Sequence, residues 1–225
     1  MKNIYIVLAH TGTILSRIIR FKTGAEYTHS SISLDKDLDH MYSFGRKNAY
    51  IALLGGFVKE SVNFGTFKRF YKTEISVFEI PVTDEQYNII SEKIEYMKEH
   101  RKEYRFNILG LFCAGFNKKM QINKRYYCAE FVKRLLEVAG IDVSTLPDVI
   151  KPEHFVKLPN AKLIYKGKLK KYRADNNFME ILIESMLRKE QNVWYDKRNA
   201  FWAFRFKIKL LSLVCVLEWH YYFII

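Results

Sequence analysis

Short stretches of alternating apolar and polar residues, each bounded by turn residues, predict β-strands in the first half of the chain. In residues 28–34, His29, Ser31 and Ser33 fall on one side of the expected strand, and Ser30, Ile32 and Leu34 on the other. The acidic turn 35–39 leads into residues 40–44, which complete a hairpin. Further strands are expected at residues 4–8, 57–62, 74–80 and 161–165.

A helical period of apolar residues predicts two well-defined helices. The first follows Thr83, which forms a capping box with Gln86, and its apolar stripe is Tyr87, Ile90, Ile94 and Met97. The second covers residues 125–139, with a broad apolar face and Gly140 as its C-cap. Shorter helices are expected at 14–19 and 152–156. The apolar segment 106–116 is too short to cross a bilayer and is expected to pack under the second helix.

The composition changes after Arg173, which predicts a domain at residues 1–173 and a helical, basic and aromatic C-terminal extension at 174–225. The extension contains helix-like stretches at 178–187 and 198–217 and all three tryptophans. Basic and aromatic residues around a short apolar run suit a membrane interface. A helix docked on the domain fits the same pattern equally well.

The chain is strongly basic, with a net charge of +13 over 225 residues. Such a charge attracts phosphate-rich partners, but the basic residues are interleaved with acids along the whole chain. This spread favours a solvated basic surface over a nucleic-acid groove, and leaves an anionic membrane surface as a candidate partner. Three cysteines without paired spacing and a first strand that begins near Met1 indicate a reducing cytoplasm, with peripheral membrane association as an option.

Cys128 and His29 are the candidates for chemistry. Cys128 lies in the first turn of the second helix, where unpaired backbone N–H groups favour the thiolate. His29 opens a strand and could accept the thiol proton. The six histidines are too scattered to predict a metal site. Tyr126 and Tyr127, just before the cysteine, either line a substrate cleft or pack at the helix entrance.

A histidine strand that precedes a cysteine helix resembles the circularly permuted papain-like amidases, a branch of the NlpC-like superfamily that includes relatives of lecithin retinol acyltransferase. The resemblance covers roughly residues 1 to 170. It implies an α+β fold in which a small, mostly antiparallel sheet packs on the cysteine helix. It also implies Cys128 as nucleophile and His29 as general base. The family's third residue lies on the strand after the histidine, where Ser43 is nearest; the family has His, Asn, Gln or Glu there.

The expected function is therefore a thiol-dependent hydrolase or acyltransferase that acts on an amide or ester bond of a peptide or lipid acyl substrate, without a metal or organic cofactor. The alternative is a module of the same fold with weak or lost catalysis that binds anionic lipid or another partner. The sequence leaves the acyl acceptor and the oligomeric state open.

Overall fold

The computed structural model describes residues 1–10, 24–47, 55–62, 66–67, 70 and 72–174. All of them belong to one compact unit of the chain, Met1–Asn176. The helix expected at 14–19, and the C-terminal extension from residue 175 onward, lie outside the described residues.

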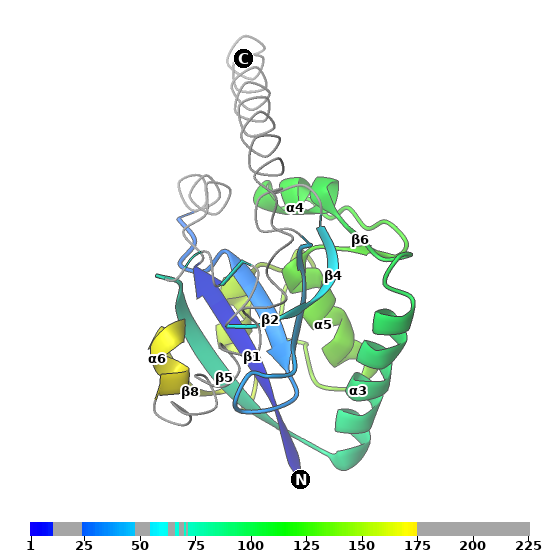
Figure 1. The fold of residues 1–225 in the computed structure, drawn as a ribbon. Helices are drawn as coiled ribbons and strands as arrows, with labels where there is room; N and C mark the ends of the chain where they lie inside the picture. Colours follow the sequence, from blue (N-terminus) through cyan, green and yellow to red (C-terminus); the bar gives the residue numbers. More distant parts are fainter. Residues whose placement is uncertain (11–23, 48–54, 63–65, 68–69, 71, 175–225) are drawn as a thin grey trace, which may run out of the picture. The chain divides into compact units, whose positions relative to one another are not determined.

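An eight-stranded sheet forms the centre of this unit, with strand order β7-β6-β4-β3-β2-β1-β5-β8 (Figure 1). All neighbouring strands pair antiparallel except β6 and β7, which are parallel. The strands are β1 (Lys2–His10), β2 (His29–Ser33), β3 (Met41–Arg46), β4 (Gly55–Glu60), β5 (Glu74–Val82), β6 (Arg105–Phe106), β7 (Arg125–Tyr126) and β8 (Lys162–Lys168). The expectation of a mixed α+β fold with a mostly antiparallel sheet is confirmed.

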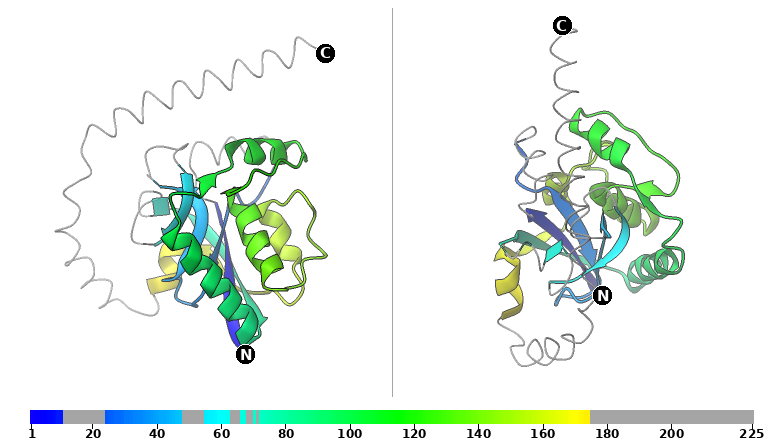
Figure 2. Two further views of the ribbon diagram at one scale, coloured as in Figure 1. Left: turned by 90° about the vertical axis from the view of Figure 1, so that its right-hand side faces the viewer. Right: turned by 45° about the horizontal axis from the view of Figure 1, so that its top comes forward.

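The sheet is covered on both faces. Helices α3 (Asp84–Glu99) and α5 (Cys128–Val138) lie on one face, and α6 (Leu169–Ala174) lies on the other (Figures 1 and 2). Alternation along β1 divides the core accordingly: Ile4, Ile6 and Leu8 pack with α3 and α5, while Tyr5, Val7 and Ala9 share a second cluster with residues of α6. A strand buried on both faces explains why residues 4–8 form a continuous apolar run.

A capping box sets the start of α3, and the pairing of the preceding residues in the sheet sets the start of α5. The capping box at Thr83 is present: the Thr83 hydroxyl accepts from the Gln86 N–H at 3.1 Å, and the Gln86 side chain accepts from the Thr83 N–H at 3.0 Å. Helix α5 starts at Cys128 instead of the predicted residue 125, because Arg125 and Tyr126 are drawn into the sheet as β7. Past its end, Gly140 takes a φ of +67°, a conformation that favours glycine.

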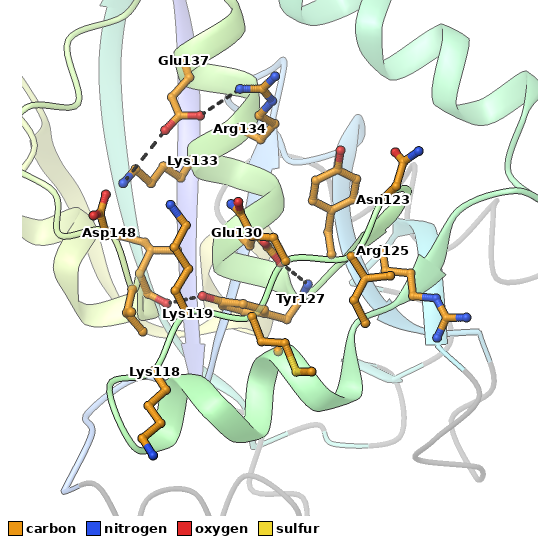
Figure 3. Close-up of a pocket in the computed structure, with 17 residues that line it drawn as sticks. Lys118, Lys119, Asn123, Arg125, Tyr127, Glu130, Lys133, Arg134, Glu137 and Asp148 are labelled. Carbon is orange, nitrogen blue, oxygen red and sulfur yellow. Dashed lines mark hydrogen bonds and ion pairs between the residues drawn. The ribbon is translucent and has the colours of Figure 1, made fainter.

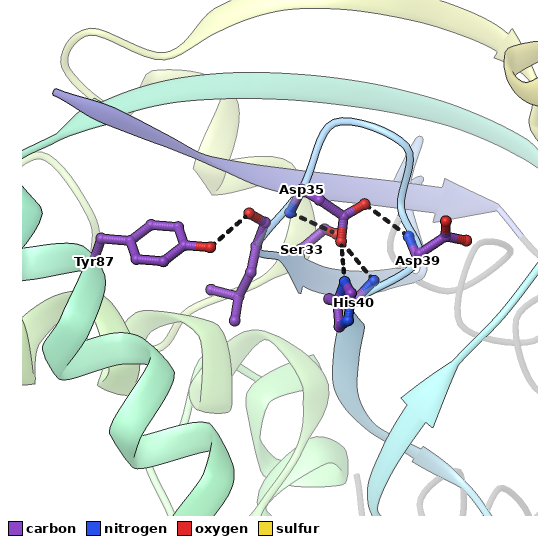
Figure 4. Close-up of polar contacts among 6 residues, drawn as sticks. Ser33, Asp35, Asp39, His40 and Tyr87 are labelled. Atoms are coloured by element: carbon purple, nitrogen blue, oxygen red, sulfur yellow. Dashed lines mark hydrogen bonds and ion pairs between the residues drawn. The ribbon is translucent and has the colours of Figure 1, made fainter. Parts of the chain in front are cut away.

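The turn between β2 and β3 is held by Asp35 (Figure 4). Its carboxylate accepts from the backbone N–H of Asp39 at 2.8 Å and of His40 at 2.7 Å, and it also contacts His40 Nδ1 at 2.8 Å. Next to this turn, the Tyr87 hydroxyl on α3 donates to the Leu34 carbonyl at 3.0 Å. These bonds fix the pairing of β2 with β3 and connect the hairpin to α3.

Residues 107–124 leave the sheet after β6 and return to it at β7, and the first half of this excursion is α4 (Ile108–Gly115). The expectation that this apolar segment packs under the cysteine helix is only partly met, because Gly110 and Ala114 are its buried residues. None of the helices that the structure describes has the length and apolarity needed to span a bilayer. Farther along the chain, Pro152–Lys157 form a short 3-10 helix, η1.

Phe131 ties α5 to the sheet, since its fully buried ring lies 5.2 Å from that of Phe44 and 5.7 Å from that of Phe57. We expect Phe131→Ala to lower the free energy of unfolding by about 3–5 kcal/mol, through lost burial and the cavity left behind. Urea unfolding measures this loss. Phe131→Leu, which keeps most of the volume, should cost clearly less; equal costs for the two variants would contradict this role of the ring.

Candidate active site

Cys128 is the first residue of α5, and its side chain is 5% exposed. Tyr127, the residue before it, has extended backbone and makes no side-chain capping bond to the first turn. The Cys128 thiol therefore lies at the positive end of the helix dipole, which favours its thiolate form.

His29 is the first residue of β2 and pairs across to Ala9 of β1. Its side chain is 14% exposed, and Nε2 lies 2.8 Å from Oε1 of Glu60. The Cys128 thiol interacts with the same imidazole, and each of the two groups shifts the pKa of the other. The structure thus brings together Cys128 and His29, the two candidates that were predicted from distant segments of the sequence.

Glu60 is the residue that sequence reasoning missed. It ends β4, and its side chain is 10% exposed. One carboxylate oxygen contacts His29, and the other accepts from the Ser31 hydroxyl, two positions along β2 on the same face. A Cβ at position 45 would lie 3.3 Å from Glu60 Oε1, so Gly45 leaves room for the carboxylate. Glutamate is among the residues that the permuted family has in the orienting position.

Ser43, the predicted third member, lies on β3 beside this group but is not the partner of the imidazole. Its buried hydroxyl lies near the Glu60 carboxylate and helps to lower the pKa of that group. The group that contacts the His29 imidazole is the Glu60 carboxylate, one strand farther along the sheet.

The charges of the three groups support one another. Burial alone would lower the pKa of His29, but the Glu60 carboxylate and Cys128 raise it to about 10. Burial alone would raise the pKa of Glu60 and of Cys128, yet the neighbouring imidazolium lowers both. These interactions favour a thiolate beside an imidazolium, stabilised by a carboxylate, over the uncharged thiol and imidazole.

When a thiolate attacks a carbonyl group, the carbonyl oxygen becomes an oxyanion. Backbone N–H groups of the first turn of α5, including that of Cys128, are the donors available to it here. Glu130 accepts from the Tyr127 N–H at 3.4 Å, which steadies the entrance to the helix. The carboxyl of Glu130 is half-buried, and burial raises its pKa.

Neither family models, nor curated proteins, nor solved structures give a match to this chain. Within the described ranges, no three His, Cys, Asp or Glu side chains converge in the way that metal ligands would.

Tyr126 and Tyr127 both make packing or hydrogen-bond contacts of their own. The Tyr126 ring packs edge-on against Phe44 at 5.2 Å. The buried Tyr127 hydroxyl donates to the Ile150 carbonyl at 3.0 Å, and burial raises its pKa. The packing alternative that the sequence left open thus describes these contacts, although both residues also line a pocket on the far side of the helix entrance.

That pocket has a volume of about 350 Å³, and Cys128 and His29 are not among its lining residues (Figure 3). It lies between α4 and α5, and basic side chains outnumber acidic ones around it. Lys133 and Arg134 share Glu137, at 3.9 and 3.3 Å. The charged lining residues are Lys118, Lys119, Arg125, Glu130, Lys133, Arg134, Glu137 and Asp148.

The electrostatics predict how Cys128 reacts with iodoacetamide as pH is varied. In the wild type, the apparent pKa of the thiol should lie below the ordinary value of about 8.5. His29→Ala should raise it above that value, because burial then acts without the imidazolium. Glu60→Gln should raise it by less. Peptide mapping of alkylated Cys128 across a pH series measures all three.

The control is Glu103→Gln, which removes the partner of Lys124 on the surface and should leave the Cys128 profile unchanged. Cys113, which is partly exposed, serves as the reference thiol in every sample. A wild-type profile that matches that of His29→Ala would contradict the coupled site.

Proposed function

We propose that this protein is a cysteine hydrolase or acyltransferase that cleaves an amide or ester bond, with Cys128 as nucleophile, His29 as general base and acid, and Glu60 as the residue that orients His29. The observation that carries the proposal is the chain of contacts from Glu60 through His29 to Cys128 at the start of a helix. Groups whose pKa values are perturbed by burial together with a specific charged partner cluster at functional sites.

In the first half-reaction, the Cys128 thiolate attacks the carbonyl carbon of the substrate, and the carbonyl oxygen becomes an oxyanion near the backbone N–H groups of α5. The intermediate collapses as the imidazolium of His29 gives its proton to the leaving nitrogen or oxygen. The products are a thioester on Cys128 and the free amine or alcohol. Glu60 holds the ring and stabilises its positive charge throughout.

In the second half-reaction, water or an acceptor amine or alcohol attacks the thioester carbonyl. Neutral His29 takes the proton of the attacking group, and the Cys128 thiolate leaves. Hydrolysis and acyl transfer differ only in this acceptor, so the same residues serve both reactions. Glu60 supplies the carboxylate that Ser43 lacks, but it does so from β4, one strand beyond the position of the third residue in the permuted family.

The proposal includes a reducing compartment, for which the cytoplasm is the natural choice. A thiolate at a helix terminus oxidises readily, so a reducing environment keeps Cys128 in its reactive form. A lower pKa gives a larger fraction of thiolate at neutral pH, and the thiolate is the form that oxidises.

Acyl-enzyme formation tests the function directly. The full chain is incubated with a panel of aryl esters, short peptides and phospholipids, and intact-mass analysis followed by peptide mapping detects an acyl group on Cys128. We expect a thioester with at least one class and no adduct in Cys128→Ala. For that substrate, His29→Ala should lower kcat/KM by about 10²–10⁴-fold, as expected for loss of a general base.

Glu60→Gln should lower kcat more than it changes KM, because the carboxylate acts through His29 and does not touch the substrate. Glu79→Gln, at a part-buried carboxylate that bonds Asn3 and Tyr5 on β1, is the matched control and should retain activity. No adduct with any substrate class, in a protein whose thiol shows a lowered pKa, would favour the alternative of a catalytically inactive module.

A further inference from the structure

Helix α4 buries its small residues and exposes its large apolar ones. Its buried residues are the small Gly110 and Ala114, while Leu109, Phe112 and the C-cap Phe116 are 56%, 57% and 58% exposed. These three positions follow a helical spacing, so they form one continuous face. Ile108 and Met120 extend it, at 41% and 40% exposure. A contiguous exposed apolar face of this kind indicates a binding surface.

The helix is held firmly in this orientation. Asn107, its N-cap, accepts from the Gly110 N–H at 2.9 Å and donates from its side chain to the Met120 carbonyl at 2.9 Å. A Cβ at position 110 would lie 2.7 Å from that carbonyl, so glycine is needed for this close approach. The helix therefore cannot easily turn its large side chains inward.

All charged residues between Tyr104 and Ala129 are basic. Lys118 and Lys119 directly follow the apolar face and also line the basic pocket beneath it (Figure 3). Lys124 is paired with Glu103, at the end of the preceding turn. The full set is Arg105, Lys118, Lys119, Lys124 and Arg125. An apolar face followed by a segment whose charged residues are all basic complements a surface that is anionic outside and apolar inside.

We propose that α4 and the adjoining residues 116–120 are a docking surface for an anionic lipid bilayer. Leu109, Phe112 and Phe116 enter the boundary between headgroups and acyl chains, and Lys118 and Lys119 contact lipid phosphates. At about 1.5 Å per residue, the eight residues of α4 span roughly 12 Å, so the helix lies in the interface and does not cross it.

The docked bilayer would lie at the catalytic end of α5. The backbone N–H of Asn107 donates to the Tyr126 carbonyl at 2.9 Å, so α4 begins beside the segment that leads into Cys128. Docking itself requires no chemistry at the thiol, and it stands or falls separately from the proposed reaction.

Vesicle sedimentation of the full chain tests the proposal. Wild type and Cys128→Ala should bind phosphatidylcholine vesicles that contain phosphatidylglycerol, and bind pure phosphatidylcholine much more weakly. Phe112→Ser/Phe116→Ser should weaken partitioning into the anionic vesicles by about tenfold or more, from the lost apolar contact. Lys118→Glu/Lys119→Glu should also weaken it, and that effect should shrink at high salt.

The matched control is Val156→Ser/Leu163→Ser, which changes two apolar side chains of similar exposure, 48% and 49%, on η1 and β8. This variant should bind as the wild type does. Equal urea midpoints and equal Cys128 labelling rates in all variants show that the fold is intact.

Hydrogen exchange with and without anionic vesicles locates the contact. The proposal expects protection in peptides from residues 107–120. Protection confined to residues 175–225, or sedimentation that the α4 variants do not alter, would overturn it. A second pair of results would also overturn it: the wild type does not bind vesicles, and it forms a concentration-dependent dimer that the α4 substitutions dissociate. A second copy of the chain would then cover this face.

Discussion

The burial of the Glu60 carboxylate is the constraint on which the arrangement of the site depends. An ionised carboxylate that loses water costs several kcal/mol unless nearby groups compensate for it. Compensation comes from His29 and Ser31, which lie on the same face of β2, whereas Glu60 lies on β4 with β3 between them. A register shift of one residue would turn the carboxylate to the opposite face of the sheet. Stability and reactivity therefore require the same strand alignment.

Elements with strong local signals could be predicted from the sequence. The capping box at Thr83 fixed the start of α3, and the alternation around His29 indicated β2 and its hairpin. Cys128 and His29 could be paired because a cysteine at a helix start and a histidine on a strand each have a local signature. The order of the two residues, histidine before cysteine, added the resemblance to the permuted family. Apart from that order, each of these signals lies within a few neighbouring residues.

The parts that were missed depend on contacts between distant segments. Glu60 reaches His29 diagonally across an intervening strand, and nothing near position 60 marks it as buried; strand alternation, which puts Glu60 on the side opposite Lys59, was the available signal. The exposure of α4 was missed for a related reason. Hydrophobicity predicts that a side chain seeks an apolar environment, but it does not say whether that environment is the protein's own core. Gly110 and Ala114 were the indication of which face turns inward.

The excursion 107–124 is closed at its base by the parallel pairing of β6 with β7, where Phe106 lies opposite Tyr126. Changes in the length or composition of the excursion are thereby separated from the position of Cys128 two residues later. The fold thus divides into the sheet with α5, which carries Glu60, His29 and Cys128, and a separate excursion beside it. Such modularity would let this excursion change in length or surface without rebuilding the sheet or moving Cys128.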